Sequence, residues 1–192
     1  MHESMDVAAK RGMKKQLDRM RTLFAKQRIV ELRNESNELI EEAARLNDKV
    51  LAEFSLICYA LHKLLTKVHI TRSTNWQNVK TRMLDAMDKC GMVVDAEEEG
   101  LFEKALLQIV KSIQAVDARA GNYVQDLYDK ARVKQASRAY GMGLSLGAAA
   151  ELTGADPKDL QNYIGTTTMH DETKEKYGIA NRVRFIKDAL GE

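Results

Sequence analysis

The stretch from Leu144 to Gly165, LSLGAAAELTGADPKDLQNYIG, constrains the fold of this chain more than any other part of the sequence. Ser145 is a good N-cap, because its hydroxyl can accept a hydrogen bond from an exposed amide of the first turn. We expect a short helix after it, over about Leu146–Thr153. Gly154 suits the left-handed residue that ends a helix. The first half of the stretch therefore predicts a short helix followed by a tight turn.

A second short helix is expected to follow that turn. Asp156 is a good N-cap for it. Pro157, the one proline of the chain, fits the first helical position, where a missing amide costs nothing. Leu160 and Ile164 then fall on one face of the helix, four residues apart. The segment therefore predicts an amphipathic helix with one apolar row.

The spacing of three residues in this stretch resembles the helix-turn-helix of lambda-repressor-type and LacI-type regulators. Ala150 lies four residues before Gly154, where two helix backbones approach closely, and Leu160 lies six residues after it. In a helix-turn-helix the second helix enters the major groove of DNA. Its face away from Leu160 carries side chains that read base edges or phosphates. We expect these to contact DNA: Lys158, Gln161 and Asn162.

The composition predicts an all-α fold. Aromatic residues make up 6% of the chain, and alanine, leucine, glutamate, lysine and arginine are abundant. A length of 192 residues allows one sizeable domain or two small ones. We expect a helical bundle or coiled-coil-like region over residues 1–120, for dimerisation or partner binding. Residues 121–192 are expected to form a helix-turn-helix domain with a terminal amphipathic helix.

The charges are segregated although the net charge is only +2. Residues 10–33 carry nine basic and two acidic side chains, and residues 85–103 carry seven acidic side chains and one basic one. This asymmetry is typical of a protein with one anion-binding end. Five cations of the first segment could lie along nucleic-acid phosphates: Lys14, Lys15, Arg19, Arg21 and Arg28. Three more precede the short helices and could hold the DNA backbone: Arg132, Lys134 and Arg138.

Apolar periodicity predicts further helices along the chain. Residues 5–45 form one long, mostly polar helix, and residues 50–68 form a central core helix. An amphipathic helix begins at Trp76 and ends at Gly91. A capping pair, Asp95 and Glu98, precedes the next helix. Further expected features are a boundary at Gly121, a polar loop over 166–172 and a terminal helix over 179–190.

Neither catalysis nor metal binding is expected. No carboxylate cluster, nucleophile triad or phosphate-cradling glycine loop stands out. No arginine is followed four to six residues later by a histidine, as one class of helical nuclease requires. His62 and His69 lack a third ligand, and Cys58 and Cys90 lack metal-binding spacing. We therefore expect no metal site, no cofactor and no enzymatic activity.

A cytoplasmic location and no membrane partner are expected. The N-terminal residues are polar and charged, which is unlike a signal peptide. The longest apolar run is interrupted by Glu53, His62 and Lys63, so it does not reach membrane-spanning length.

The run from Lys130 to Glu172 resembles a family of small, mostly archaeal helical proteins that are often encoded beside PIN-type ribonucleases. The resemblance implies a DNA-binding regulator with an antitoxin-like role and a PIN-type ribonuclease as partner. Asp156-Pro157 departs from that family, which has serine and an aromatic residue at the start of the second helix. The matching residues are Ala149, Ala150, Glu151, Leu152, Gly154, Leu160, Tyr163, Ile164, Gly165, Thr166, Thr168, His170, Asp171 and Glu172.

Two hypotheses of function stay open at this point. The favoured one is a homodimeric transcriptional regulator that binds duplex DNA. It needs cations outside the second short helix, because Lys158 is followed directly by Asp159. The alternative is an RNA- or ribonucleoprotein-binding helical protein that uses the basic N-terminal helix.

Overall fold

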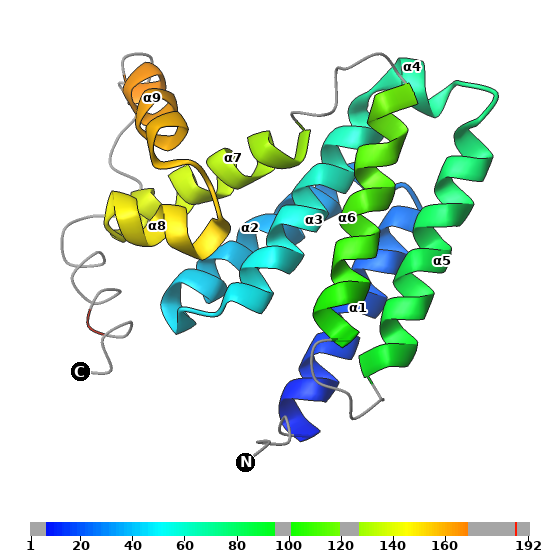
Figure 1. The fold of residues 1–192 in the computed structure, drawn as a ribbon, viewed down its shortest axis with the longest axis horizontal. Coiled ribbons are helices and arrows are strands. Elements are labelled where there is room, and N and C mark those ends of the chain that lie inside the picture. Colours follow the sequence, from blue (N-terminus) through cyan, green and yellow to red (C-terminus); the bar gives the residue numbers. More distant parts are fainter. Residues whose placement is uncertain (1–6, 95–100, 120–126, 169–186, 188–192) are drawn as a thin grey trace. The chain divides into compact units, whose positions relative to one another are not determined.

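The computed structural model describes residues 7–94, 101–119, 127–168 and 187, and every element within these ranges is an α-helix (Figure 1). The all-α prediction is confirmed for this part of the chain. Among the described helices, none has the length and apolar character of a membrane-spanning segment. The helices are α1 Val7–Ala25, α2 Ile29–Leu46, α3 Lys49–Thr66, α4 Val68–Thr71, α5 Trp76–Val94, α6 Leu101–Arg119, α7 Leu127–Gly141, α8 Leu146–Thr153 and α9 Pro157–Thr168.

Several predicted features lie outside the described residues. They are the capping pair Asp95 and Glu98, the boundary at Gly121, residues 169–172 of the polar loop, and the terminal helix apart from Lys187. The loop prediction is wrong for Thr166–Thr168, which form the last turn of α9.

The chain divides into two compact units. The first comprises Met1–Arg33 and Ile57–Tyr128, and the second comprises Asn34–Leu56 and Asp129–Glu192. Helices α2 and α3 therefore contribute one part to each unit. In this division residues 34–56 group with the C-terminal part. The domain boundary expected at residue 120 stays a prediction.

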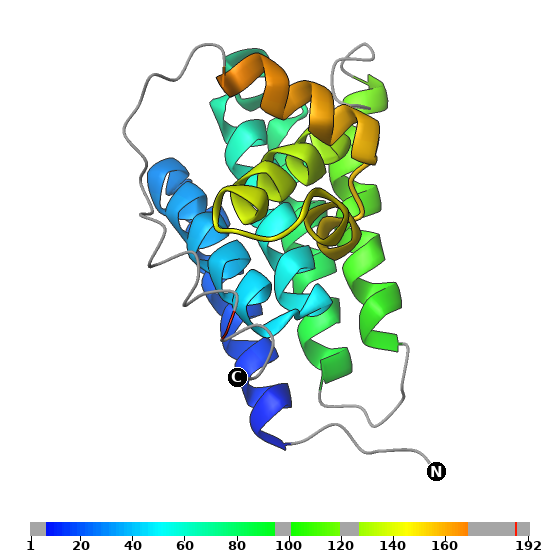
Figure 2. The same cartoon turned by 90° about the vertical axis from the view of Figure 1, so that its left-hand side faces the viewer.

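The first unit contains a bundle in which α5 packs against both α1 and α6 (Figures 1 and 2). Leu17, Met20 and Phe24 form an apolar seam along α1 and are buried. The Phe24 ring meets Trp76 of α5 edge-on, with ring centroids 6.2 Å apart. This geometry is favourable for aromatic pairs, and Trp76 is a core residue that is 4% exposed.

The predicted single helix over residues 5–45 is wrong, because the chain turns at Gln27. Gln27 adopts a left-handed conformation, with φ at 53°. Its N–H donates to the Phe24 carbonyl (3.0 Å), and the Arg28 N–H donates to the Leu23 carbonyl (2.9 Å). This pair of hydrogen bonds is a Schellman motif, which usually has glycine at the left-handed position. With glutamine there, the sequence carries no signal for the end of α1.

Gly91 does not end α5, which continues to Val94. Among the described glycines, positive φ is found at Gly143 and Gly154, so Gly91 keeps helical geometry. A Cβ atom at Gly91 would lie 3.5 Å from Leu17 Cδ2 of α1, which is ordinary contact distance. The glycine therefore lies within the helix, at the packing surface between α5 and α1.

The predicted core helix over residues 50–68 corresponds to α3, which ends at Thr66. Asp48 caps it, since its Oδ1 accepts from the N–H groups of Val50 (2.8 Å) and Leu51 (3.0 Å). Val68 lies beyond the end of α3 and is 55% exposed.

Small residues dominate the core of the second unit. Its buried cluster includes Ala43 and Ala44 of α2, Ala52 of α3, and Ala136 and Ala139 of α7. Alanine at these positions lets helix backbones approach closely. Leu152 of α8 and Leu160 of α9 belong to the same cluster and supply larger apolar side chains.

Buried hydrogen bonds connect three helices of this unit. Ser36 Oγ donates to the Ser55 carbonyl and Ser55 Oγ donates to the Ser36 carbonyl, each at 2.8 Å. Gln135 of α7 donates from Nε2 to Ser36 Oγ, also at 2.8 Å. Because buried polar groups are costly without partners, these bonds favour one register of α2, α3 and α7.

The end of α1 yields a stability prediction. Gln27→Gly should raise the free energy of unfolding by about 1 kcal/mol, because a left-handed conformation costs an L-residue about 1–2 kcal/mol and glycine recovers only part of that. Asn47, at φ 51°, is a matched control. Asn47→Gly should give a smaller gain, since asparagine tolerates this conformation. Urea denaturation measures both variants, and an unchanged or lower stability for Gln27→Gly would contradict the account.

Candidate nucleic-acid interface

The predicted bounds of α8 and the predicted start of α9 are confirmed, but α9 continues to Thr168, three residues into the stretch expected to be a loop. Ser145 Oγ accepts from the Ala148 N–H (3.1 Å), so it caps α8. Gly154 is left-handed, with φ at 67°, and ends α8. Asp156 Oδ1 accepts from the N–H groups of Lys158 (2.8 Å) and Asp159 (3.1 Å), and so caps α9. Local capping therefore determines where both helices begin and where α8 ends.

The side chains expected beneath the turn are buried. Leu160 has no exposed surface, and Ala150 is 3% exposed. Ile164 packs partly buried against the same cluster. Figure 1 shows α8 and α9 running in different directions, with α7 beside them. Apolar burial of one row along α9 leaves its opposite face at the surface.

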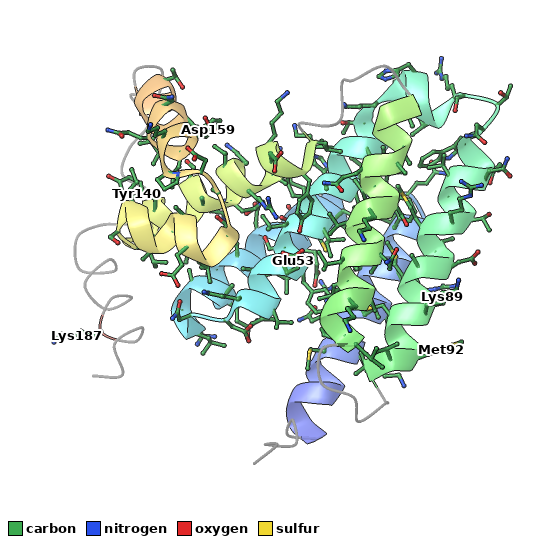
Figure 3. The ribbon with its side chains drawn as sticks, in the orientation of Figure 1. Glu53, Lys89, Met92, Tyr140, Asp159 and Lys187 are labelled. Atoms are coloured by element: carbon green, nitrogen blue, oxygen red, sulfur yellow. The ribbon has the colours of Figure 1, made fainter. Side chains whose placement is uncertain are left out.

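The three side chains expected to contact DNA bases all lie on that surface. Lys158, Gln161 and Asn162 are exposed. Asp159, which projects from the same helix, is exposed as well (Figure 3). The first turn of α9 therefore carries one positive and one negative charge, and the two amide side chains follow it. The electrostatic attraction of this face for phosphate is small.

The three α7 cations expected to hold the DNA backbone contact other side chains of the second unit. Arg132 Nη1 lies 3.2 Å from Asp129 Oδ1. Arg138 forms an ion pair with Glu41 of α2, in which its Nε lies 3.2 Å from Oε1. Arg138 and Glu41 keep side-chain exposures of 30% and 36%. These ion pairs lower the number of α7 charges that are available to a phosphate without rearrangement.

Lys134 of α7 contacts α9. Its Nζ donates to the Tyr163 hydroxyl oxygen (2.9 Å) and lies 5.3 Å from the centroid of the ring. The two residues are 29 positions apart in the chain, so no local pattern predicts the contact. Both side chains are half-buried.

The N-terminal cations belong to the first unit and differ in their surroundings. Lys14, Lys15 and Arg19 are exposed on α1. Arg21 donates from Nη2 to Asp88 Oδ2 of α5 (2.9 Å), and this hydrogen bond raises the pKa of Arg21. Arg28 Nε lies 3.1 Å from Glu31 Oε1. Arg21 thus connects α1 to α5 through an ion pair. Lys14, Lys15 and Arg19 form an exposed basic face of α1.

His62, Cys58 and Cys90 are buried, whereas His69 is exposed. His62 Nδ1 lies 2.9 Å from the Ile29 carbonyl oxygen, and burial lowers the pKa of His62. Burial raises the pKa of Cys90 to about 12, so its thiol is protonated and unreactive at neutral pH. In the described parts of the chain, no group of three or more histidine, cysteine or acidic side chains could hold a metal ion.

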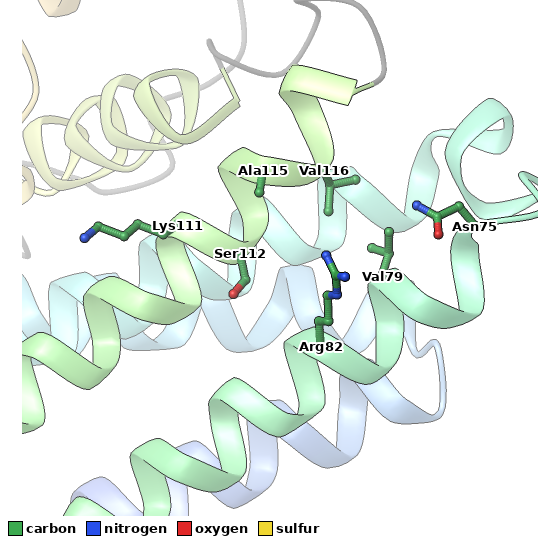
Figure 4. A pocket seen from close by; sticks show the side chains of 7 residues that line it. All are labelled: Asn75, Val79, Arg82, Lys111, Ser112, Ala115 and Val116. Carbon is green, nitrogen blue, oxygen red and sulfur yellow. The ribbon is translucent and has the colours of Figure 1, made fainter.

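A shallow pocket of about 220 Å³ lies between α5 and α6 (Figure 4). Arg82 and Asn75 are exposed at its rim, and Figure 4 shows the Lys111 side chain extending away from the other lining residues. The Ser112 hydroxyl donates to the Gln108 carbonyl of its own helix (2.7 Å). The pocket therefore has few convergent polar groups, and it is a weaker candidate site than the surface of α9.

Comparison with models of protein families, with curated proteins and with solved structures found no match for this chain.

The turn between α8 and α9 yields a second stability prediction. Gly154→Ala should lower the free energy of unfolding by about 1–2 kcal/mol, because alanine is strained at φ 67°. Gly147 is the matched control: it lies in α8, and a Cβ atom there meets nothing within 4 Å. Gly147→Ala should be neutral or raise the stability by up to about 1 kcal/mol. Urea denaturation followed by circular dichroism compares the two, and equal effects would argue against the turn geometry.

Proposed function

We propose that this chain is a transcriptional regulator that binds duplex DNA through a helix-turn-helix formed by α8 and α9. The main support is the outward face of α9, where Lys158, Gln161 and Asn162 are exposed opposite the buried Leu160. Lysine contacts guanine or phosphate, and glutamine and asparagine pair with adenine edges in the major groove. Gly154, left-handed between the helices, supports the same proposal.

The proposal includes a homodimer. One copy of α9 carries one cation next to one acid, so it makes few favourable phosphate contacts. Two copies on adjacent half-sites double the contacts and are the usual arrangement for helix-turn-helix proteins. Multi-angle light scattering of the purified chain measures its mass in solution, and a monomer at all concentrations would argue against this part.

The resemblance of residues 130–172 to proteins encoded beside PIN-type ribonucleases extends the proposal to an antitoxin-like role. In this role a PIN-type ribonuclease binds the chain, and DNA binding represses expression of the pair. Co-expression with the product of an adjacent PIN-type gene tests the role, and failure of the two chains to copurify would speak against it.

DNA binding through α9 is tested by selection from a library of random duplexes. The wild-type chain should enrich one sequence, and the triple variant Lys158→Ala, Gln161→Ala, Asn162→Ala should bind that sequence at least about 100-fold more weakly, since each specific base contact contributes about 1–3 kcal/mol. Fluorescence anisotropy at fixed salt gives the affinities.

Helix α5 offers a matched control with the same residue types: Gln77, Asn78 and Lys80. Their triple alanine variant should keep the wild-type affinity. If the α9 variant enriches the same sequence and binds it with the wild-type affinity, then Lys158, Gln161 and Asn162 do not contact the bases.

The exposed basic face of α1 supports a second candidate function, which is RNA binding. Lys15 and Arg19 are four residues apart on one face of the helix and are exposed. Deletion of α1 cannot test this, because it would remove Leu17 and Met20 from the core. The double variant Lys15→Gln, Arg19→Gln keeps the core, and under this alternative it should lose most RNA affinity at matched salt.

A further inference from the structure

We propose that Lys134 is a positioning residue, which sets the orientation of α9 through Tyr163 and thereby determines how selectively α9 recognises a DNA sequence. The consequence for DNA rests on the proposed function. The effect on α9 itself does not, because it follows from contacts within the second unit. The proposal replaces the expectation that Lys134 holds a phosphate.

The apolar contacts of α9 leave one motion weakly opposed. Leu160 and Ile164 are four residues apart, so they form a single row along the helix axis. Such a row resists lifting of α9 from the core, but it resists rolling of the helix about that row much less. Tyr163 is three residues after Leu160, which places it about 60° away around the helix. A contact at Tyr163 therefore opposes the roll.

Lys134 supplies that contact from a firmly held helix. Its Nζ donates to the Tyr163 hydroxyl oxygen at 2.9 Å and lies 5.3 Å from the ring centroid. The next two residues of α7, Gln135 and Ala136, are 1% and 0% exposed, and Gln135 donates to Ser36 of α2. Lys134 thus lies next to a buried polar network that holds α7 in place, and its contact with Tyr163 fixes α9 relative to α7.

The size of the effect on base contacts can be estimated from helix geometry. Side-chain tips lie about 5–6 Å from a helix axis, and those on the outward face lie farther than that from the buried row, so a roll of about 20° moves them by about 2 Å or more. Hydrogen bonds to bases are confined to a window of about 0.5 Å in length. A roll of this size therefore removes contacts from Gln161 and Asn162 to bases, while the positive charge of the unit changes little.

The first test is hydrogen–deuterium exchange of the full-length free protein. Lys134→Met keeps the aliphatic stem and removes the donor, and Tyr163→Phe keeps the ring and removes the acceptor. Both should raise exchange of the amides of residues 160–166 about three- to tenfold, as expected for loss of one such hydrogen bond. Lys134→Arg should exchange at close to the wild-type rate, because arginine can also donate a hydrogen bond to the Tyr163 hydroxyl oxygen.

Lys130→Met is the matched control, since it removes the same charge one turn earlier on α7. It should leave exchange in α9 unchanged. Equal exchange in Lys134→Met and the wild type would overturn the proposal, whatever the chain does with DNA. This test also decides the positioning role if the wild-type chain binds no duplex, an outcome that refutes only the proposed function.

The second test compares affinities for the selected duplex and for an unrelated duplex. Lys134→Met should lower the ratio of the two affinities about tenfold, since one or more base contacts are lost. The slope of log affinity for the unrelated duplex against log salt should match that of the wild type. A fall of about 0.9 in that slope, with equal weakening on both duplexes, would mean that Lys134 contacts a phosphate, and it would overturn the proposal.

Discussion

Close packing of small side chains in the second unit is the constraint on which the candidate interface depends. Alanines of α2, α3 and α7 are buried together with Ala149 and Ala150 of α8. Larger side chains there would push the helices apart, and overpacking of a core typically costs about 1–3 kcal/mol. Since Leu160 of α9 inserts into the same cluster, the outward face of α9 is determined by what lies beneath it.

Three cations in the described part of the second unit connect one helix to another. Arg138 pairs with Glu41, Lys49 lies 3.0 Å from Glu151, and Lys134 contacts α9. These pairs are partly or largely exposed, so each contributes little to stability, but each favours one arrangement of its helices. Under the proposed function, selectivity depends on the orientation of α9, and affinity for phosphates has to come from other cations or from a second copy.

Features encoded within a few residues could be predicted from the sequence, and contacts between distant residues could not. Ser145, Gly154 and Asp156 determine the ends of α8 and the start of α9 through local hydrogen bonds, and all three were identifiable. The end of α1 at Gln27 was not, because glutamine is uncommon in a left-handed turn. The contact between Lys134 and Tyr163 depends on tertiary packing. Charge alone suggested a phosphate contact for Lys134 and gave no sign of its contact with Tyr163.

The proposed function requires α9 to contact the bases of a preferred DNA sequence. Its most direct test is an NMR titration of the full-length, isotope-labelled chain with the selected duplex. We expect the amide signals of Lys158, Gln161 and Asn162 to change with the sequence of the duplex, and those of α1 to stay the same. Sequence-dependent changes confined to α1, with the signals of α9 unaffected, would contradict the proposed function.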